Sequence, residues 1–228
     1  KENKLRLQIK KQFEHYLSPD MVKKLQKNPS LLKLGGERKE LTFMFSDIRG
    51  FTPISESMKD NPEELTRYVN KFLTAMTDII LKNGGTIDKY MGDCIMAFWN
   101  APIDCKNHRE LAVKSAIEMK TKLDQMNKNA EFDPPLKIGI GLNTGDCLVG
   151  NMGSEQRFDY SVIGDAVNLA SRLEGVSKYY NTTIIISENT ANGIDFIPLS
   201  RPKGFKFYKV DKTFVKGKKE KISIFSVH

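Results

Sequence analysis

The chain has 228 residues, with 39% hydrophobic and 28% charged side chains, which is typical of a globular domain with a full core. No run approaches the roughly 18 consecutive apolar residues of a membrane span, and three scattered cysteines exclude a disulfide framework and a CxxC zinc cluster. The net charge of +8 admits nucleic acid, an anionic membrane surface or a polyphosphate as partner, besides a simple solvated basic surface.

The amino-terminal segment, residues 1–35, is basic and repeats apolar side chains with helical spacing, as at Leu5 and Ile9. Ser18-Pro19 provides a cap and a first-turn proline for a second helix. We therefore expect a helical connector, either self-associating or merely solvated, followed by a main domain at 36–228.

Apolar runs and capping signals predict the elements of the main domain. In chain order these are a strand at 41–46, a helix from Asn61 to the Gly84-Gly85 stop, a hairpin of strands 86–90 and 94–99, a helix at 108–126, a strand at 136–142 that turns at 144–146 into 147–150, a helix at 165–177, a strand at 183–187, and strands at 205–210 and 222–227 around a turn at 216–218. This order predicts an α/β fold of the α+β sandwich type, a mixed sheet with helices over one face.

Two aspartates lie close to turn glycines at the ends of strand-like runs. Asp47 precedes Gly50, and Asp93 directly follows Gly92. If strand 41–46 pairs beside the hairpin, both carboxylates reach one sheet edge, where they repel each other unless a hard cation neutralises them. Mg²⁺ and Mn²⁺ take oxygen ligands and bridge to phosphates. Two turn-capping surface aspartates are the alternative, but the pair favours a metal site for a nucleoside triphosphate.

Two further segments suit phosphate chemistry. Gly50-Phe51-Thr52 follows the first aspartate, and a glycine there lets backbone N–H groups cradle an anion. Asn168 and Arg172 are i and i+4 on a predicted helix and share one face. An amide and a guanidinium one turn apart can orient a sugar and stabilise a pentavalent phosphorus. Spacing alone favours the alternative, a surface salt bridge from Arg172 to Glu174 or to a neighbour.

Three segments, Phe45–Thr52, Lys89–Cys94 and Tyr160–Glu174, together resemble the catalytic domain of class III nucleotidyl cyclases. The lead-in, Phe13–Pro19 and Gly35–Arg38, is similar to what precedes this domain in bacterial membrane-receptor adenylate cyclases. The resemblance implies a ferredoxin-like fold, a head-to-tail homodimer with two shared sites, and conversion of ATP to 3′,5′-cyclic AMP and pyrophosphate with Mg²⁺ or Mn²⁺, two ions per site. It also implies the cytoplasmic domain of a longer, membrane-anchored bacterial protein with an upstream sensor.

The resemblance also implies a role for individual residues. The matching positions are Asp47, Asp93 and the Ile48 carbonyl as metal ligands, Lys89 and Ser161 as base-selecting residues, Lys137 and Lys216 as phosphate-binding cations, and Asn168 and Arg172 as transition-state residues.

Lys89 and Ser161 predict adenine as the base. Lys89 can donate to adenine N1, whereas guanine N1 carries a hydrogen, and Ser161 can accept from the adenine amino group. Many family members have Asp at the position of Ser161, so base selection here rests more on Lys89. The alternatives are a guanylate cyclase, a catalytically silent nucleotide-binding regulatory module and a basic nucleic-acid binder. The joint presence of both metal carboxylates, Asn168 and Arg172 argues against the silent module, and we expect no nucleic acid as partner.

Overall fold

The computed structural model describes residues 34–194, 206–214 and 221–227. Most of the predicted connector, the predicted turn at 216–218 and Lys216 lie outside these residues. In chain order the helices and strands are β1 (Gly35–Ile48), α3 (Phe51–Ser57), α4 (Pro62–Lys82), β2 (Thr86–Met91), β3 (Cys94–Trp99), α5 (His108–Lys128), β4 (Ile138–Gly153), β5 (Phe158–Ile163), α6 (Asp165–Tyr179), β6 (Ile184–Ser187), α7 (Glu188–Ala191), β7 (Phe207–Thr213) and β8 (Ile222–Val227).

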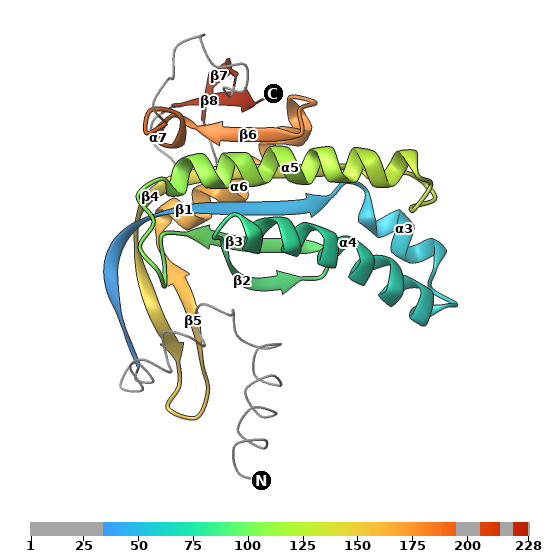
Figure 1. The fold of residues 1–228 in the computed structure, drawn as a ribbon, viewed down its shortest axis with the longest axis horizontal. Helices are drawn as coiled ribbons and strands as arrows, with labels where there is room; N and C mark the ends of the chain where they lie inside the picture. The colour runs from blue at the N-terminus through green and yellow to red at the C-terminus, as the bar shows by residue number, and fades with distance from the viewer. Residues whose placement is uncertain (1–33, 195–205, 215–220, 228) are drawn as a thin grey trace.

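The described strands form one eight-stranded mixed sheet in the order β2-β3-β1-β4-β6-β8-β7, with β5 paired to β4 (Figure 1). β1 is antiparallel to β3 on one side and to β4 on the other. The unit β1-α4-β2 therefore encloses β3, and the unit β3-α5-β4 encloses β1. These two interleaved split β-α-β units are the predicted ferredoxin-like arrangement, so the fold class is confirmed.

Helices cover both faces of the sheet, so the predicted placement over one face is wrong in this detail. Met44 of β1 packs with Phe72 of α4 and Met119 of α5. Its neighbour Phe43 packs with Val167 of α6. Because successive strand residues point to opposite faces, α6 lies across the sheet from α4 and α5. The physical reason is that β1 is apolar at consecutive positions and needs cover on both sides.

Helix α6 lies unusually close to β4. A Cβ atom on Gly141 would be 2.2 Å from the Glu174 nitrogen and 2.5 Å from the Ala170 carbonyl oxygen. A Cβ atom on Gly145 would be 2.8 Å from the Ala166 Cβ. Small residues of β4 thus face α6, while Ile140 and Leu142 face the cluster of α4 and α5. This alternation seats α6 directly on the strand.

The predicted turn at 144–146 is wrong, because β4 continues through it. Thr144 pairs with Thr42 and Gly145 with Leu41, so β1 satisfies the backbone groups that a turn would otherwise use. The sequence prediction also missed β5, whose polar residues alternate irregularly, and the short helices α3 and α7. The start of β1, the end of β4 and β5 extend beyond the helices as a curved arm (Figure 1).

The predicted start of α4 is confirmed. Asn61 accepts a hydrogen bond from the Glu64 N–H at 3.2 Å and donates to the Glu64 carboxylate at 2.9 Å, with Pro62 in the first turn. None of the helices in the described part of the chain combines the length and the apolar character that a bilayer crossing requires.

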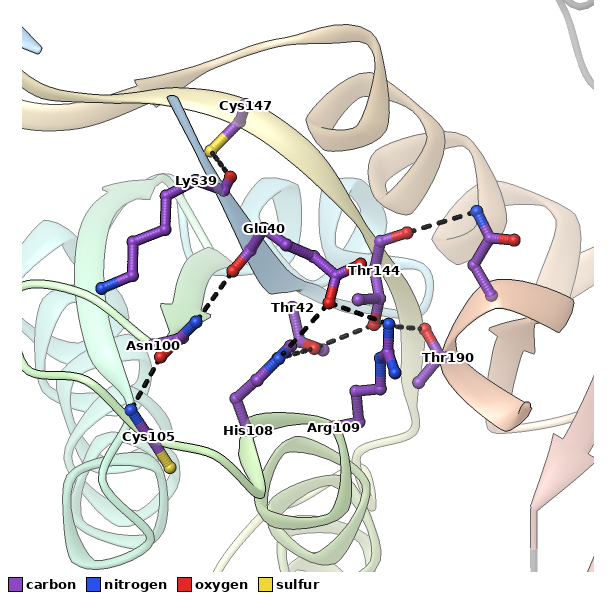
Figure 2. A network of polar contacts seen from close by, with 11 residues as sticks. Lys39, Glu40, Thr42, Asn100, Cys105, His108, Arg109, Thr144, Cys147 and Thr190 are labelled. Atoms are coloured by element: carbon purple, nitrogen blue, oxygen red, sulfur yellow. Dashed lines mark hydrogen bonds and ion pairs between the residues drawn. The ribbon is translucent and has the colours of Figure 1, made fainter. Parts of the chain in front are cut away.

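A buried polar network joins β1, α5, β4 and α7 (Figure 2). The Thr42 hydroxyl lies 2.7 Å from His108 Nδ1 and 2.8 Å from the Thr144 hydroxyl, which in turn lies 3.0 Å from the Thr190 hydroxyl. Burial lowers the pKa of His108, and the positive charge of Arg109 lowers it further. The folded protein therefore favours the neutral imidazole.

This histidine is expected to make folding stability fall at acidic pH. Its folded pKa lies below the unfolded value near 6.5, so its contribution is complete above that pH and is lost as pH falls. Glu40 opposes the shift and Lys39 adds to it. Urea unfolding at pH 8 and pH 5.5 should show a larger loss for the wild type than for His108→Asn, which keeps a polar group near Thr42 but does not titrate. Equal losses in both proteins would contradict this role.

Candidate active site

The two predicted metal carboxylates lie together at one end of β1. Asp47 is the penultimate residue of β1, and Asp93 follows Gly92 in the β2–β3 turn. The Ile48 N–H donates to Asp93 Oδ2 at 3.1 Å. Burial, a hydrogen bond to Asp47 and the negative charge of Asp47 together raise the pKa of Asp93 to about 7. The fold therefore disfavours two negative charges here, and a cation between the carboxylates would relieve their repulsion.

The donor set fits a magnesium-like ion better than a self-contained metal cage. Within residues 34–194, 206–214 and 221–227, no cluster of three or more His, Cys, Asp or Glu side chains could hold a metal. Two carboxylates with a backbone carbonyl, such as that of Ile48, leave coordination positions for water and phosphate oxygens. Mg²⁺ binds in this way, through one or two carboxylates and the phosphates of a substrate.

The predicted phosphate-binding segment opens a helix beside Asp47. Gly50 has φ 68°, in the left-handed region, and no side chain in the described structure caps the α3 helix that begins at Phe51. The Phe51 ring packs against the core, so its backbone N–H is the group left for an anion. Thr52 is exposed in the same turn. The arrangement agrees with a backbone phosphate cradle.

Lys137 lies beside the same end of β1. Its carbonyl accepts the Arg49 N–H at 2.8 Å, and its side chain is exposed. It lines a pocket of about 290 Å³ together with Arg49 and Lys178. The position is compatible with a phosphate-binding cation.

The two predicted base-selecting residues meet at a third residue that the sequence prediction missed. Ser161 Oγ donates to Asp88 Oδ2 at 2.8 Å, and Lys89 Nζ lies 3.2 Å from Asp88 Oδ1. The Asp88 side chain is 0% exposed, whereas that of Lys89 is 47% exposed. In a regular strand, Asp88 and Lys89 would point to opposite faces. Here the pairing slips between Ile87↔Ala97 and Lys89↔Met96, so Asp88 is the extra residue of a β-bulge.

The two predicted transition-state residues lie on α6, and Arg172 forms no salt bridge with Glu174 or with another residue in the described ranges. Glu174 instead pairs with Arg49, at 3.0 Å from Nη1. Arg172 Nη1 is buried and has no hydrogen-bond partner among the described residues. Asn168 is exposed. Burial raises the pKa of Glu174 to about 7 although the charge of Arg49 opposes the shift.

These groups form separate parts within one chain. Among the described residues, no hydrogen bond or ion pair joins the Asp47–Asp93 pair to the Lys89–Ser161 pair or to the polar residues of α6. Arg49 provides the nearest link, because it follows Ile48 and its guanidinium contacts Glu174 and Ser177.

Comparisons with known proteins show the family of the domain. A sequence model of the adenylate and guanylate cyclase catalytic domain matches residues 36–228, and the chain belongs to this family. An adenylate cyclase of Anabaena cylindrica is 39% identical over 83% of the chain, which spans only 37% of that relative. The solved adenylyl cyclase CyaB from P. aeruginosa is 37% identical, with a TM-score of 0.75 over 86% of this chain and 96% of that one. The guanylyl cyclase Cya2 is also 37% identical, with a TM-score of 0.70 over 85% and 94%.

Removing one carboxylate should stabilise the protein in the absence of metal. Asp93→Asn keeps an oxygen acceptor for the Ile48 N–H but relieves the repulsion with Asp47, so we expect a gain of up to about 1 kcal/mol in EDTA. Mn²⁺ should raise the melting temperature of the wild type more than that of the variant.

Asp78→Asn, an exposed change on α4, is the control for the loss of one negative charge. It should change neither the stability in EDTA nor the rise in melting temperature caused by Mn²⁺. A lower melting temperature for Asp93→Asn in EDTA would show that the two carboxylates are compatible without a cation.

Proposed function

We propose that this domain is an adenylate cyclase that converts ATP to 3′,5′-cyclic AMP and pyrophosphate. The observation that carries the proposal is the contact cluster of Lys89, Ser161 and Asp88, which offers an ammonium donor beside a hydroxyl acceptor. Adenine presents the matching edge, an acceptor at N1 and a donor amino group, whereas guanine presents the reverse at both positions. Family membership supports the cyclase reaction, and this cluster supports ATP as the substrate.

Each group at the proposed site has a role in the reaction. The ribose 3′-OH attacks the α-phosphorus, and pyrophosphate leaves. Two divalent ions, Mg²⁺ or Mn²⁺, held by Asp47, Asp93 and the Ile48 carbonyl, would lower the pKa of the 3′-OH and neutralise the polyphosphate. Asn168 orients the ribose, and Arg172 stabilises charge on the pentavalent phosphorus. The unpartnered Arg172 Nη1 supports this role, because a buried donor without an acceptor suits an anion that arrives with the substrate.

The backbone amides of Gly50, Phe51 and Thr52, together with Lys137 and Lys216, complete the proposed contacts to the phosphates. Burial of the Phe51 ring in the core supports a backbone contact rather than a side-chain contact.

We propose that two chains build each site. The absence of a described contact between the carboxylates and the base-binding cluster supports shared sites. Exposed apolar side chains on the arm support an interface between two copies: Leu148 and Ile163 face each other across β4 and β5 and are 45% and 62% exposed. One copy would supply Asp47 and Asp93, and the other Lys89 and the polar residues of α6. Curated relatives that extend well beyond the match support a larger protein in which this domain is coupled to a sensor region.

Guanylate cyclase activity is the second candidate. The relatives CyaB and Cya2 have opposite named activities but are equally identical to this chain. Overall similarity therefore does not select the base, and the chemistry of Lys89 and Ser161 decides the proposal.

The product formed from each nucleotide tests the proposal. With Mn²⁺, ATP should give cyclic AMP with a kcat/KM at least about tenfold above that for cyclic GMP from GTP, as one mismatched buried hydrogen bond allows. EDTA should abolish both. Cyclic GMP as main product would establish the guanylate cyclase alternative. No cyclic product at any protein concentration would establish the silent module.

Complementation tests the shared sites. Asp47→Ala and Asn168→Ala should each be inactive alone, but an equal mixture should regain about a quarter of wild-type activity, because half of random dimers then contain one intact site of two. A mixture of Asp47→Ala with Asp93→Ala should stay inactive, since both changes damage the same part. If the mixture of Asp47→Ala with Asn168→Ala stays inactive although light scattering shows dimers, each site lies within one chain.

A further inference from the structure

Asp88 has chemistry that the proposed reaction does not use directly. Its carboxylate is completely covered, although it lies on β2 between the part-buried Ile87 and the exposed Lys89. A buried carboxylate is costly unless its oxygens have partners. The Ser161 hydroxyl donates to Oδ2, and the Lys89 ammonium lies 3.2 Å from Oδ1 as an ion pair, although Oδ1 accepts no hydrogen bond within the described part of the chain. Ser161 and Lys89 are the residues expected to face the purine.

The contact with Ser161 determines which way that hydroxyl can act. A serine hydroxyl has one proton and two lone pairs, and a carboxylate can only accept. Because Ser161 gives its proton to Asp88 at 2.8 Å, it has only lone pairs left for a third group. Ser161 is 9% exposed, so water has little access with which to reorient the hydroxyl. The hydroxyl is thereby held as an acceptor.

The contact with Lys89 restricts the position of the second base-selecting side chain. The ammonium lies 3.2 Å from Asp88 Oδ1, and the long lysine side chain is otherwise half exposed and free to adopt many rotamers. The β-bulge is what makes this possible, because it brings two consecutive side chains of β2 to the same side. Asp88 thus anchors a donor and an acceptor next to each other.

We infer that Asp88 is a positioning residue for base selection, which holds Ser161 as a hydrogen-bond acceptor and Lys89 as a donor so that the pair accepts a 6-aminopurine and rejects a 6-oxopurine. This inference rests on the proposed function for the place where the base binds. Without the carboxylate, the Ser161 hydroxyl rotates and can donate to a 6-oxo group. Asp88 then determines selectivity without touching the nucleotide.

The test uses the isosteric change Asp88→Asn, whose amide can donate to Ser161 and so release the hydroxyl proton. Binding of 3′-deoxy-ATP and 3′-deoxy-GTP, which cannot cyclise, is measured by calorimetry with Mn²⁺, beside kcat/KM for ATP and GTP. We expect the preference for the adenine nucleotide to fall about tenfold or more in both assays. General damage to the fold would instead weaken both nucleotides alike.

A double-mutant cycle identifies Ser161 as the intermediary. In a Ser161→Ala background, Asp88→Asn should lower the remaining preference by less than in the wild type, because part of its effect passes through the missing hydroxyl. Asp78→Asn is the matched control and should leave the preference unchanged. Equal effects of Asp88→Asn in both backgrounds, or an unchanged preference in the single variant, would overturn the inference.

The outcomes separate the inference from the proposed function. If the wild type makes cyclic AMP and Asp88→Asn keeps its preference, the inference fails and the cyclase stands. If the wild type makes no cyclic product but Asp88→Asn loses preference in binding, the cyclase fails and the inference stands. If the wild type binds neither nucleotide, both are wrong.

Discussion

Strand β1 pairs with antiparallel neighbours on both sides, and these two ladders determine where the groups of the site lie. Pairing of Ser46 with Ile95 of β3 brings the hairpin turn, and with it Asp93, to the end of β1. Pairing of Asp47 with Gly139 of β4 aligns the same end with the glycines on which α6 lies. A slip of one residue in either ladder would turn apolar side chains of β1 to the opposite faces. The register that the core requires therefore also positions the carboxylates.

Helix α6 is held to this strand end by two kinds of contact. Gly141 allows its backbone to lie against β4 without a side chain between them. The Arg49 guanidinium, one residue beyond β1, reaches Glu174 and Ser177 near the end of the helix. A partly buried ion pair of this kind contributes more to the choice of one packing than to net stability. The carboxylate end of β1 and the helix that carries Asn168 are therefore joined by direct contacts.

Several charged groups of the candidate site have incomplete partners within the described part of the chain. Asp93 lies against another carboxylate, Arg172 Nη1 has no partner among the described residues, and the covered Asp88 is the extra residue of a bulge. In contrast, the buried network around His108 and Thr144 joins its polar groups to one another (Figure 2). Poorly satisfied charged groups reduce stability, and such a cost is expected where the charges serve a ligand rather than the fold.

The sequence by itself determined the features that depend on neighbouring residues. The Asn61 cap, the hairpin around Gly92 and the apolar run of β1 are local signals, and they were sufficient to place Asp47 and Asp93 at one edge. Tertiary structure decided what depends on distant partners: β4 continues through Thr144 because β1 satisfies its backbone, and α6 lies on the second face of the sheet. The slip that brings Asp88 beside Lys89 arises in the same way, since a bulge is a relation between two strands and has no pattern in either one alone.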